Sequence, residues 1–190
     1  MTEITENTVQ NPALPPALEA FVLQWGDLGG EWGVNRSVSQ IHAWLFLAEV
    51  PLNAEDICRD LGMARSNVSN SLKELMAWNL ISRVPVRGER RDHFVAETDV
   101  WEIAARIASA RKAREIDPAL SALQRCVAEA SEDGSVTNVQ RKRLKSMLEF
   151  TRSVDRWYGQ MLSLSRPKRQ ALLKMGARIS AFLPGGDNAR

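Results

Sequence analysis

Apolar residues recur at helical spacing after a polar stretch at 1–13, which we expect to be a flexible tail. The first apolar face predicts a helix that begins at Pro15 and Pro16, since proline is tolerated in a first helical turn. We expect this helix to end at Gly29, Gly30 and Gly33. The residues of its apolar face are Leu18, Phe21, Val22, Trp25 and Leu28.

A second helix follows, and either Ser37 or Ser39 can cap its N-terminus. Pro51 stops it, because proline cannot continue a helix. Its apolar stripe consists of Ile41, Trp44, Leu45 and Ala48.

Two short helices joined by a tight turn are predicted between residues 53 and 79. Asn53 is a good N-cap, and Asp56 lies where the helix dipole favours an acidic side chain. Gly62 breaks the first helix, and the turn to the second helix is short. Two helices joined by such a short turn cross at a steep angle. Asn79 suits the left-handed conformation that ends the second helix. The inward-facing apolar positions of the pair are Ile57, Leu61, Val68, Leu72 and Leu75.

Residues rich in β-branched side chains then predict a β-hairpin. Its strands are expected at 80–86 and 92–96, on either side of a charged turn at 87–91. Pro85 indicates an edge strand or a bulge, because proline cannot donate to a ladder.

From Asp99 onward the spacing predicts helices only: one that ends at Pro118, a second at about 120–130, a long one capped by Thr137, and a short one reaching Ile179. The predicted fold class is mainly α with a small β-hairpin wing. Residues 36–97 would form a winged helix-turn-helix. An N-terminal dimerisation helix at 14–35 would precede it, and a helical dimerisation and effector region at 98–183 would follow. A second flexible tail is expected at 184–190.

Composition places the chain among ordinary globular proteins and narrows the classes of function. The 190 residues are 44% hydrophobic and 25% charged. No apolar run approaches the ~20 residues of a membrane span, and 1–10 lacks the pattern of a secretory signal, so we expect a cytoplasmic protein with no membrane partner. No phosphate loop, nucleophile elbow or metal-ligand spacing is present, so neither an enzyme nor a cofactor or metal site is predicted.

The isolated histidines and cysteines favour structural roles. His42 and His93 are expected in the core or on the surface rather than as ligands or bases. Cys58 lies beside the helix-turn-helix, where a redox switch is conceivable, but a buried apolar role is the common fate of such a thiol.

The polar positions of the second helix and of the hairpin turn favour double-stranded DNA as a partner. Residues 64–95 hold six Lys and Arg against three Asp and Glu. Amide, hydroxyl and guanidinium groups are the side chains that read base edges and bind phosphates. The alternative is a winged helix that docks a protein without gripping DNA. The predicted DNA-binding residues are Arg65, Ser66, Asn67, Ser69, Asn70 and Lys73 on the helix, and Arg87, Arg90 and Arg91 on the wing.

Several segments resemble the GbsR-type branch of the MarR family of winged helix-turn-helix transcriptional regulators. These segments are 41–47, 61–69, 72–75, 87–90 and 111–118, together with Phe94 and Asp99-Val100-Trp101. The resemblance implies a homodimer with interleaved terminal helices that reads a pseudo-palindromic operator. It also implies a repressor released by a small molecule, with choline and osmolyte control known for some members. Two residues depart from the pattern: Asn79 replaces a common glycine, and Ala64 replaces a common Ser or Thr cap.

Aromatic and apolar residues outside the winged helix supply candidates for a dimer interface and an effector site. Apolar faces on the first and last helices favour association, although packing within one chain is the alternative. Aromatic faces attract quaternary ammonium cations, but tryptophan at helical spacing more often belongs to a core. The interface candidates are Trp25, Trp157, Leu162, Leu172 and Met175, and the effector candidates are Trp32, Trp101 and Tyr158.

Overall fold

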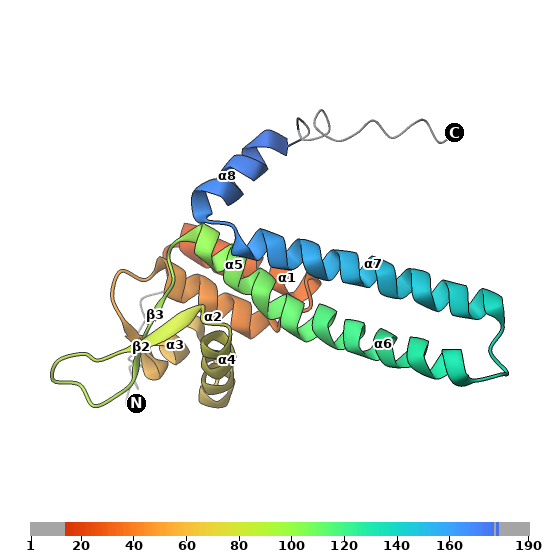
Figure 1. Ribbon diagram of the computed structural model, residues 1–190. Coiled ribbons are helices and arrows are strands. Elements are labelled where there is room, and N and C mark those ends of the chain that lie inside the picture. Colours follow the sequence, from red (N-terminus) through yellow and green to blue (C-terminus); the bar gives the residue numbers. More distant parts are fainter. Residues whose placement is uncertain (1–13, 177, 179–190) are drawn as a thin grey trace, which may run out of the picture. The chain divides into compact units, whose positions relative to one another are not determined.

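The computed structural model describes residues 14–176 and residue 178, and these form a mostly helical chain with one small sheet (Figure 1). The expected tails at 1–13 and 184–190, and Ile179, lie outside these residues. The chain divides into two compact units, 1–106 and 107–190. The elements are α1 (Pro16–Glu31), α2 (Arg36–Leu47), β1 (Leu52–Asn53), α3 (Ala54–Leu61), α4 (Arg65–Ala77), β2 (Ile81–Val84), β3 (His93–Ala96), α5 (Val100–Arg111), the π-helical turn η1 (Lys112–Ile116), α6 (Asp117–Glu132), α7 (Asn138–Ser163) and α8 (Arg166–Met175).

The first unit is built around α2, which packs against α1 on one side and α4 on another. Its core consists of apolar side chains from α2, α3, α4 and the residues that lead into β2. The largest fully buried side chains are Ile41, Ile57, Val68, Leu75 and Leu80. Mainly α architecture with a small hairpin wing is therefore confirmed.

The sheet has three antiparallel strands in the order β1-β3-β2. The hairpin was predicted, and its strands pair Ile81 with Ala96 and Val84 with His93. Pro85 follows the last paired residue of β2, as expected for a residue without a backbone donor. Strand β1 was not predicted, because two residues give no alternation to detect; it pairs Leu52 with Phe94.

Helix α1 does not end at Gly29 and Gly30, so that expectation was wrong. Both glycines lie inside the helix, and at Gly29 the helix α2 approaches α1 too closely for a larger side chain. A Cβ atom built on Gly29 would lie 1.9 Å from the Ser39 hydroxyl, and one on Gly26 would lie 2.5 Å from the Gln40 side chain. Asn35, rather than Ser37 or Ser39, caps α2, and its side chain accepts from the Ser37 N–H at 2.8 Å.

The expected break at Pro118 was also wrong, because the chain stays helical from α5 through η1 into α6. A proline within a helix lacks the N–H for the bond four residues back, and its ring crowds that carbonyl. The preceding π turn changes the local spacing: the Asp117 N–H donates to the Lys112 carbonyl, five residues back. The Lys112 ammonium pairs with Asp117 at 2.6 Å and with Asp155 of α7 at 2.7 Å.

In the second unit, α6 and α7 run side by side as a helical hairpin (Figure 1). As predicted, Thr137 caps α7, in a reciprocal capping box with Gln140. Leu148 and Ala130 are buried, whereas Met147, Phe150 and Trp157 of α7 are exposed.

We predict that Gly29→Ala destabilises the protein by about 1–3 kcal/mol, because the added methyl group must displace Ser39 in a packed helix contact. Gly30→Ala is the matched control, since a Cβ there meets no atom within 4 Å. Alanine is the better helix former, so this control should gain up to ~1 kcal/mol. Urea unfolding of both variants measures the difference. Equal effects would contradict the close approach of α1 and α2.

A second prediction concerns His42, a histidine that is 4% exposed in α2. Its Nε2 has no hydrogen-bond partner among the described residues, and burial lowers its pKa from 6.5 to about 4. The unfolded chain then binds this proton at a higher pH than the folded chain, so acidification favours unfolding. Between about pH 7 and about pH 5 the protein should lose about 2 kcal/mol more stability than His42→Met. Urea unfolding at both pH values tests this, and identical losses would contradict it.

Candidate nucleic-acid interface

The segment from Asn53 to Asn79 places α3 and α4 as a helix-turn-helix. Asn53 accepts from the Glu55 and Asp56 N–H groups at 2.9 and 3.1 Å, and the Asp56 side chain accepts from the Asn53 N–H. This is the cap that the sequence predicted. Gly62 has a φ of +63°, the left-handed conformation that turns the chain sharply after α3.

The end of α4 is also specified locally. Asn79 has a φ of +56°, so the residue expected to accept the left-handed conformation does so. The Asn79 N–H donates to the Met76 carbonyl and the Leu80 N–H to the Leu75 carbonyl. These are the two bonds of a Schellman motif, and they direct the chain from α4 into β2.

The two faces of α4 differ in chemistry. Val68, Leu72 and Leu75 are buried, and of the predicted inward set only Leu61 in α3 is half-buried. The opposite face presents five of the six DNA-binding candidates to solvent: Arg65, Ser66, Ser69, Asn70 and Lys73. Asn67, the sixth, is half-buried, and its amide donates to the Ser37 hydroxyl of α2 at 2.8 Å.

The N-terminus of α4 carries no side-chain cap. Ala64 occupies the N-cap position, so the first backbone N–H groups of α4 receive no side-chain acceptor from it. Such groups, together with the positive end of the helix dipole, attract anions.

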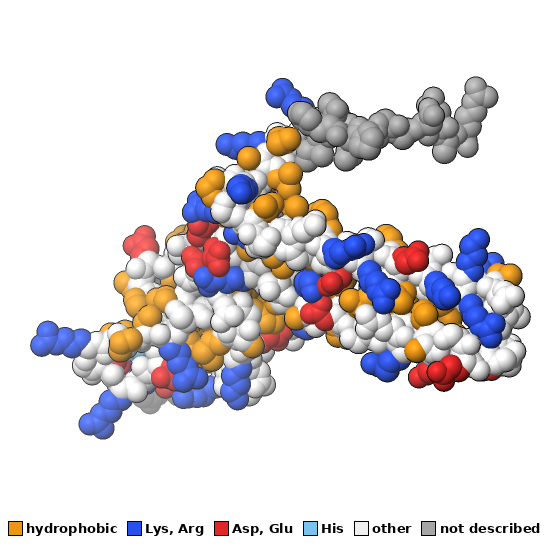
Figure 2. All heavy atoms as spheres, in the orientation of Figure 1, with side chains coloured by type: hydrophobic (Ala, Val, Ile, Leu, Met, Phe, Trp, Pro, Cys, Tyr) orange, Lys and Arg blue, Asp and Glu red, His pale blue; other side chains and the backbone are white. Residues whose placement is uncertain are grey.

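The wing supplies further exposed cations. Arg87, Arg90 and Arg91 all lie in the exposed segment between β2 and β3, where Gly88 has a φ of +85°. Figure 2 shows Lys and Arg side chains gathered over the region of this hairpin and α4.

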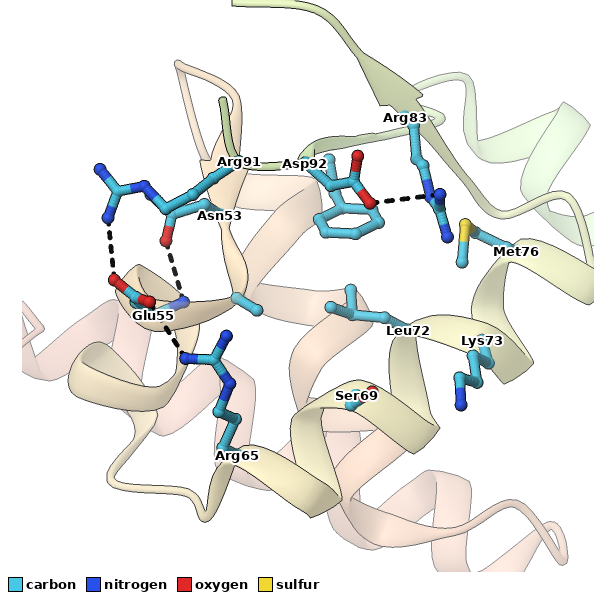
Figure 3. A pocket seen from close by; sticks show the side chains of 12 residues that line it. Asn53, Glu55, Arg65, Ser69, Leu72, Lys73, Met76, Arg83, Arg91 and Asp92 are labelled. Carbon is cyan, nitrogen blue, oxygen red and sulfur yellow. Dashed lines mark hydrogen bonds and ion pairs between the residues drawn. The ribbon is translucent and has the colours of Figure 1, made fainter. Parts of the chain in front are cut away.

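A cleft of about 290 Å³ separates α4 from the hairpin (Figure 3). Four cationic side chains line it, two from α4 and two from the hairpin: Arg65, Lys73, Arg83 and Arg91. Two acids, Glu55 and Asp92, also line it. The cleft therefore carries more positive than negative charge, on the side where the polar face of α4 meets the wing.

Ion pairs organise this cleft. Glu55 lies in the first turn of α3 and pairs with Arg65 at 3.0 Å and with Arg91 at 2.8 Å. Arg91 also pairs with Glu89, and Arg83 pairs with Asp92 at 3.2 Å. Hydrogen bonds from Arg65 and then Arg91 lower the pKa of Glu55, which keeps its carboxylate charged.

Sequence reasoning named Arg65 and Arg91 but missed Glu55, Arg83 and Asp92. The ion pairs of Glu55 join residues 10 and 36 positions apart, so no helical or strand period connects them. The only available signal was that Glu55 lies two residues after the predicted N-cap Asn53, in the first turn of its helix.

The effector candidates lie on separate elements. Trp32 is 58% exposed at the C-cap of α1, Trp101 is half-buried in α5, and Tyr158 is half-buried in α7. None of the three side chains lines the cleft between α4 and the wing.

The dimer candidates differ in exposure. Trp157 and Met175 are exposed, whereas Trp25, Leu162 and Leu172 are half-buried. Trp25 stacks on Phe21 at 5.7 Å within α1, and Trp157 meets Tyr158 edge-on at 5.4 Å.

The histidines and Cys58 lie outside the lining of the cleft. His42 is a core residue, and His93 is buried with its ring Nδ1 3.0 Å from the Arg91 carbonyl oxygen. Cys58 is half-buried rather than buried. Within 14–176 and 178, no three His, Cys, Asp or Glu side chains gather where they could hold a metal ion. No helix in this range is both long and apolar enough to cross a membrane.

Residues 32–92 match a family model described as the MarR family. The chain thus has a winged-helix domain similar to that of the MarR family, joined to a helical region. Finer placement in the GbsR-type branch receives no support from the match. No curated protein matches the chain.

Solved structures that are similar to the chain include the following two. One, described as a transcriptional regulator, shares 16% identity at a TM-score of 0.61 and covers 77% of this chain and 96% of its own. The other is a single-residue mutant of S. aureus MepR bound to an oligodeoxyribonucleotide. It shares 17% identity at a TM-score of 0.36 and covers 73% of this chain and 89% of its own. At 16% identity, the similarity to the first structure shows a shared fold.

Proposed function

We propose that this protein is a sequence-specific, non-enzymatic DNA-binding transcriptional regulator. The observation that carries the proposal is the cleft between α4 and the wing, with four cations and an exposed polar helix face beside it. The major groove admits one α-helix, and a hairpin beside that helix can reach the neighbouring minor groove. The MarR-type domain supports this assignment.

The side chains of α4 divide into two proposed roles. Asn70 is exposed and suits bidentate contact with adenine, whereas Asn67 must first leave Ser37 to do so. Phosphate contacts position the protein, and base contacts give it sequence preference. The side chains that suit phosphate contacts are Arg65, Ser66, Ser69 and Lys73 on α4, and Arg87, Arg90 and Arg91 on the wing.

Dimerisation and ligand response complete the proposal. A two-fold dimer would read two half-sites about one helical turn (~34 Å) apart. Exposure of Trp157 and Met175 leaves apolar surface for a partner copy. Repression relieved by a small molecule is the proposed mode of regulation. The proposed interface residues are Trp25, Trp157, Leu162, Leu172 and Met175, and the proposed ligand contacts are Trp32, Trp101 and Tyr158.

Selection of bound sequences from a random duplex pool tests the proposed function. A two-fold palindrome with half-sites about ten base pairs apart is the expected result.

The variant Asn70→Ala should then lose roughly 1–3 kcal/mol of affinity for this sequence and relax the preference at one operator position. Arg90→Ala should instead weaken binding to all duplexes and reduce the salt slope by about 1. Recovery of no sequence, with a protein partner bound through α4, would favour the docking alternative.

Light scattering tests the dimer separately. At micromolar concentration the protein should have twice the chain mass of 21.2 kDa. Trp157→Ser should shift the population toward single chains, because an exposed apolar anchor is lost, while the thermal stability of the first unit stays close to wild type. A wild-type mass of a single chain would contradict the proposed dimer.

A further inference from the structure

Glu55 holds two arginines that belong to different parts of the cleft. Its Oε1 accepts from Arg65 Nη1 at 3.0 Å, and its Oε2 accepts from Arg91 Nη1 at 2.8 Å. Arg65 begins α4, and Arg91 leads into β3 (Figure 3). The two guanidinium groups therefore converge on one small anion that offers one oxygen to each.

A DNA phosphodiester offers the same arrangement. It has two non-bridging oxygens, shares one negative charge between them, and is bound by arginine in the same geometry as a carboxylate. We propose that Arg65 and Arg91 together form one binding site for a backbone phosphate of DNA, which the Glu55 carboxylate fills while DNA is absent.

The position of this pair matches the path of a DNA strand. If α4 lies in a major groove and the wing in the adjacent minor groove, the backbone that separates these grooves must cross the cleft between them. Arg65 and Arg91 lie on the two sides of that cleft. This inference rests on the proposed function and adds to it that Glu55 competes with the phosphate for the two arginines.

The exchange requires Glu55 to leave by rotation and not by protonation. Its pKa is lowered, so the carboxylate remains charged at neutral pH. The three side chains are 50–73% exposed, so water can hydrate the carboxylate once it swings away. Exposed ion pairs of this kind contribute little to folding, and their loss leaves the fold intact.

The opposing interpretation is that Glu55 positions the two arginines for DNA. The two interpretations predict opposite signs when the charge of Glu55 is removed. A competitor lowers DNA affinity, so its removal strengthens binding. A positioning residue supports DNA affinity, so its removal weakens binding.

Glu55→Gln separates these interpretations, because glutamine keeps the shape of the side chain and removes its charge. Fluorescence anisotropy with a random-sequence duplex gives the affinity at several KCl concentrations. Affinity at about 0.1 M KCl should rise roughly five- to tenfold, because the phosphate no longer has to displace a carboxylate held by two exposed ion pairs. The slope of log K against log salt should stay close to that of wild type, because the same phosphate is neutralised in both proteins.

Two controls make the result specific to this site. Glu31→Gln changes the net charge equally at an exposed position of α1 outside the cleft, and should leave the affinity within about twofold of wild type. Arg91→Gln added to Glu55→Gln should remove most of the gain, because one half of the phosphate site is lost. Circular dichroism melts establish that all variants are folded.

The outcomes distinguish the inference from the function on which it rests. Tighter binding with Glu55→Gln, absent with Glu31→Gln, supports the phosphate site. Weaker or unchanged binding with Glu55→Gln overturns it, while the DNA-binding function stands. A wild-type protein with no salt-dependent binding to any duplex overturns both.

Discussion

Burial of one face of α4 is the constraint on which the rest of the first unit depends. Val68 and Leu75 are almost fully buried against a core that includes Ile41 of α2 and Ile57 of α3. Because a helix has a fixed period, fixing this apolar face also fixes the direction of the opposite face. The polar surface is a consequence of the packing beneath it. The side chains that consequently lie next to the cleft are Arg65, Ser69 and Lys73.

Helix α2 connects α4 to the N-terminal helix α1. On one side Ser39 and Gln40 lie where Gly29 and Gly26 leave room for them, and on another side Ser37 accepts a hydrogen bond from Asn67 of α4. A ligand changes DNA binding only if it binds two arrangements of the protein unequally. Since α2 contacts both α1 and α4, any rearrangement of the α1–α2 contact moves the helix whose Ser37 accepts the hydrogen bond from Asn67 of α4.

Local signals in the sequence were sufficient for most of the helical architecture and for the exposed face of α4. The Asn53–Asp56 cap, Gly62, Asn79 and the Thr137 cap each specify backbone geometry within a few residues, so a sequence pattern can detect them. Features that depend on tertiary contacts could not be predicted in this way. Gly29 leaves room for Ser39 of the next helix to approach closely. The sequence alone does not show this contact, so Gly29 was interpreted as the end of its helix.

Three further features could not be predicted from local sequence patterns: the continuous helix through Pro118, strand β1 and the role of Glu55. Proline predicts a break, but a π turn kept the chain helical through it. Strand β1 exists only because Leu52 pairs with Phe94 of β3, which is 42 positions further along the chain and is the central strand of the sheet. The role of Glu55 depends on two arginines that reach it from opposite sides of the cleft.

Exposure determines whether such an ion pair is a structural feature or an exchangeable one. A buried pair costs a large desolvation penalty when either partner is removed, so it stays closed. The Glu55 pairs are half exposed or more, and their charges are screened by water and salt. Exchange of a carboxylate for a phosphodiester replaces one anion with another of similar geometry, so the arginines never lack a partner. The density of negative charge along DNA then decides which anion occupies the site, because each phosphate that is neutralised also releases counterions into solution.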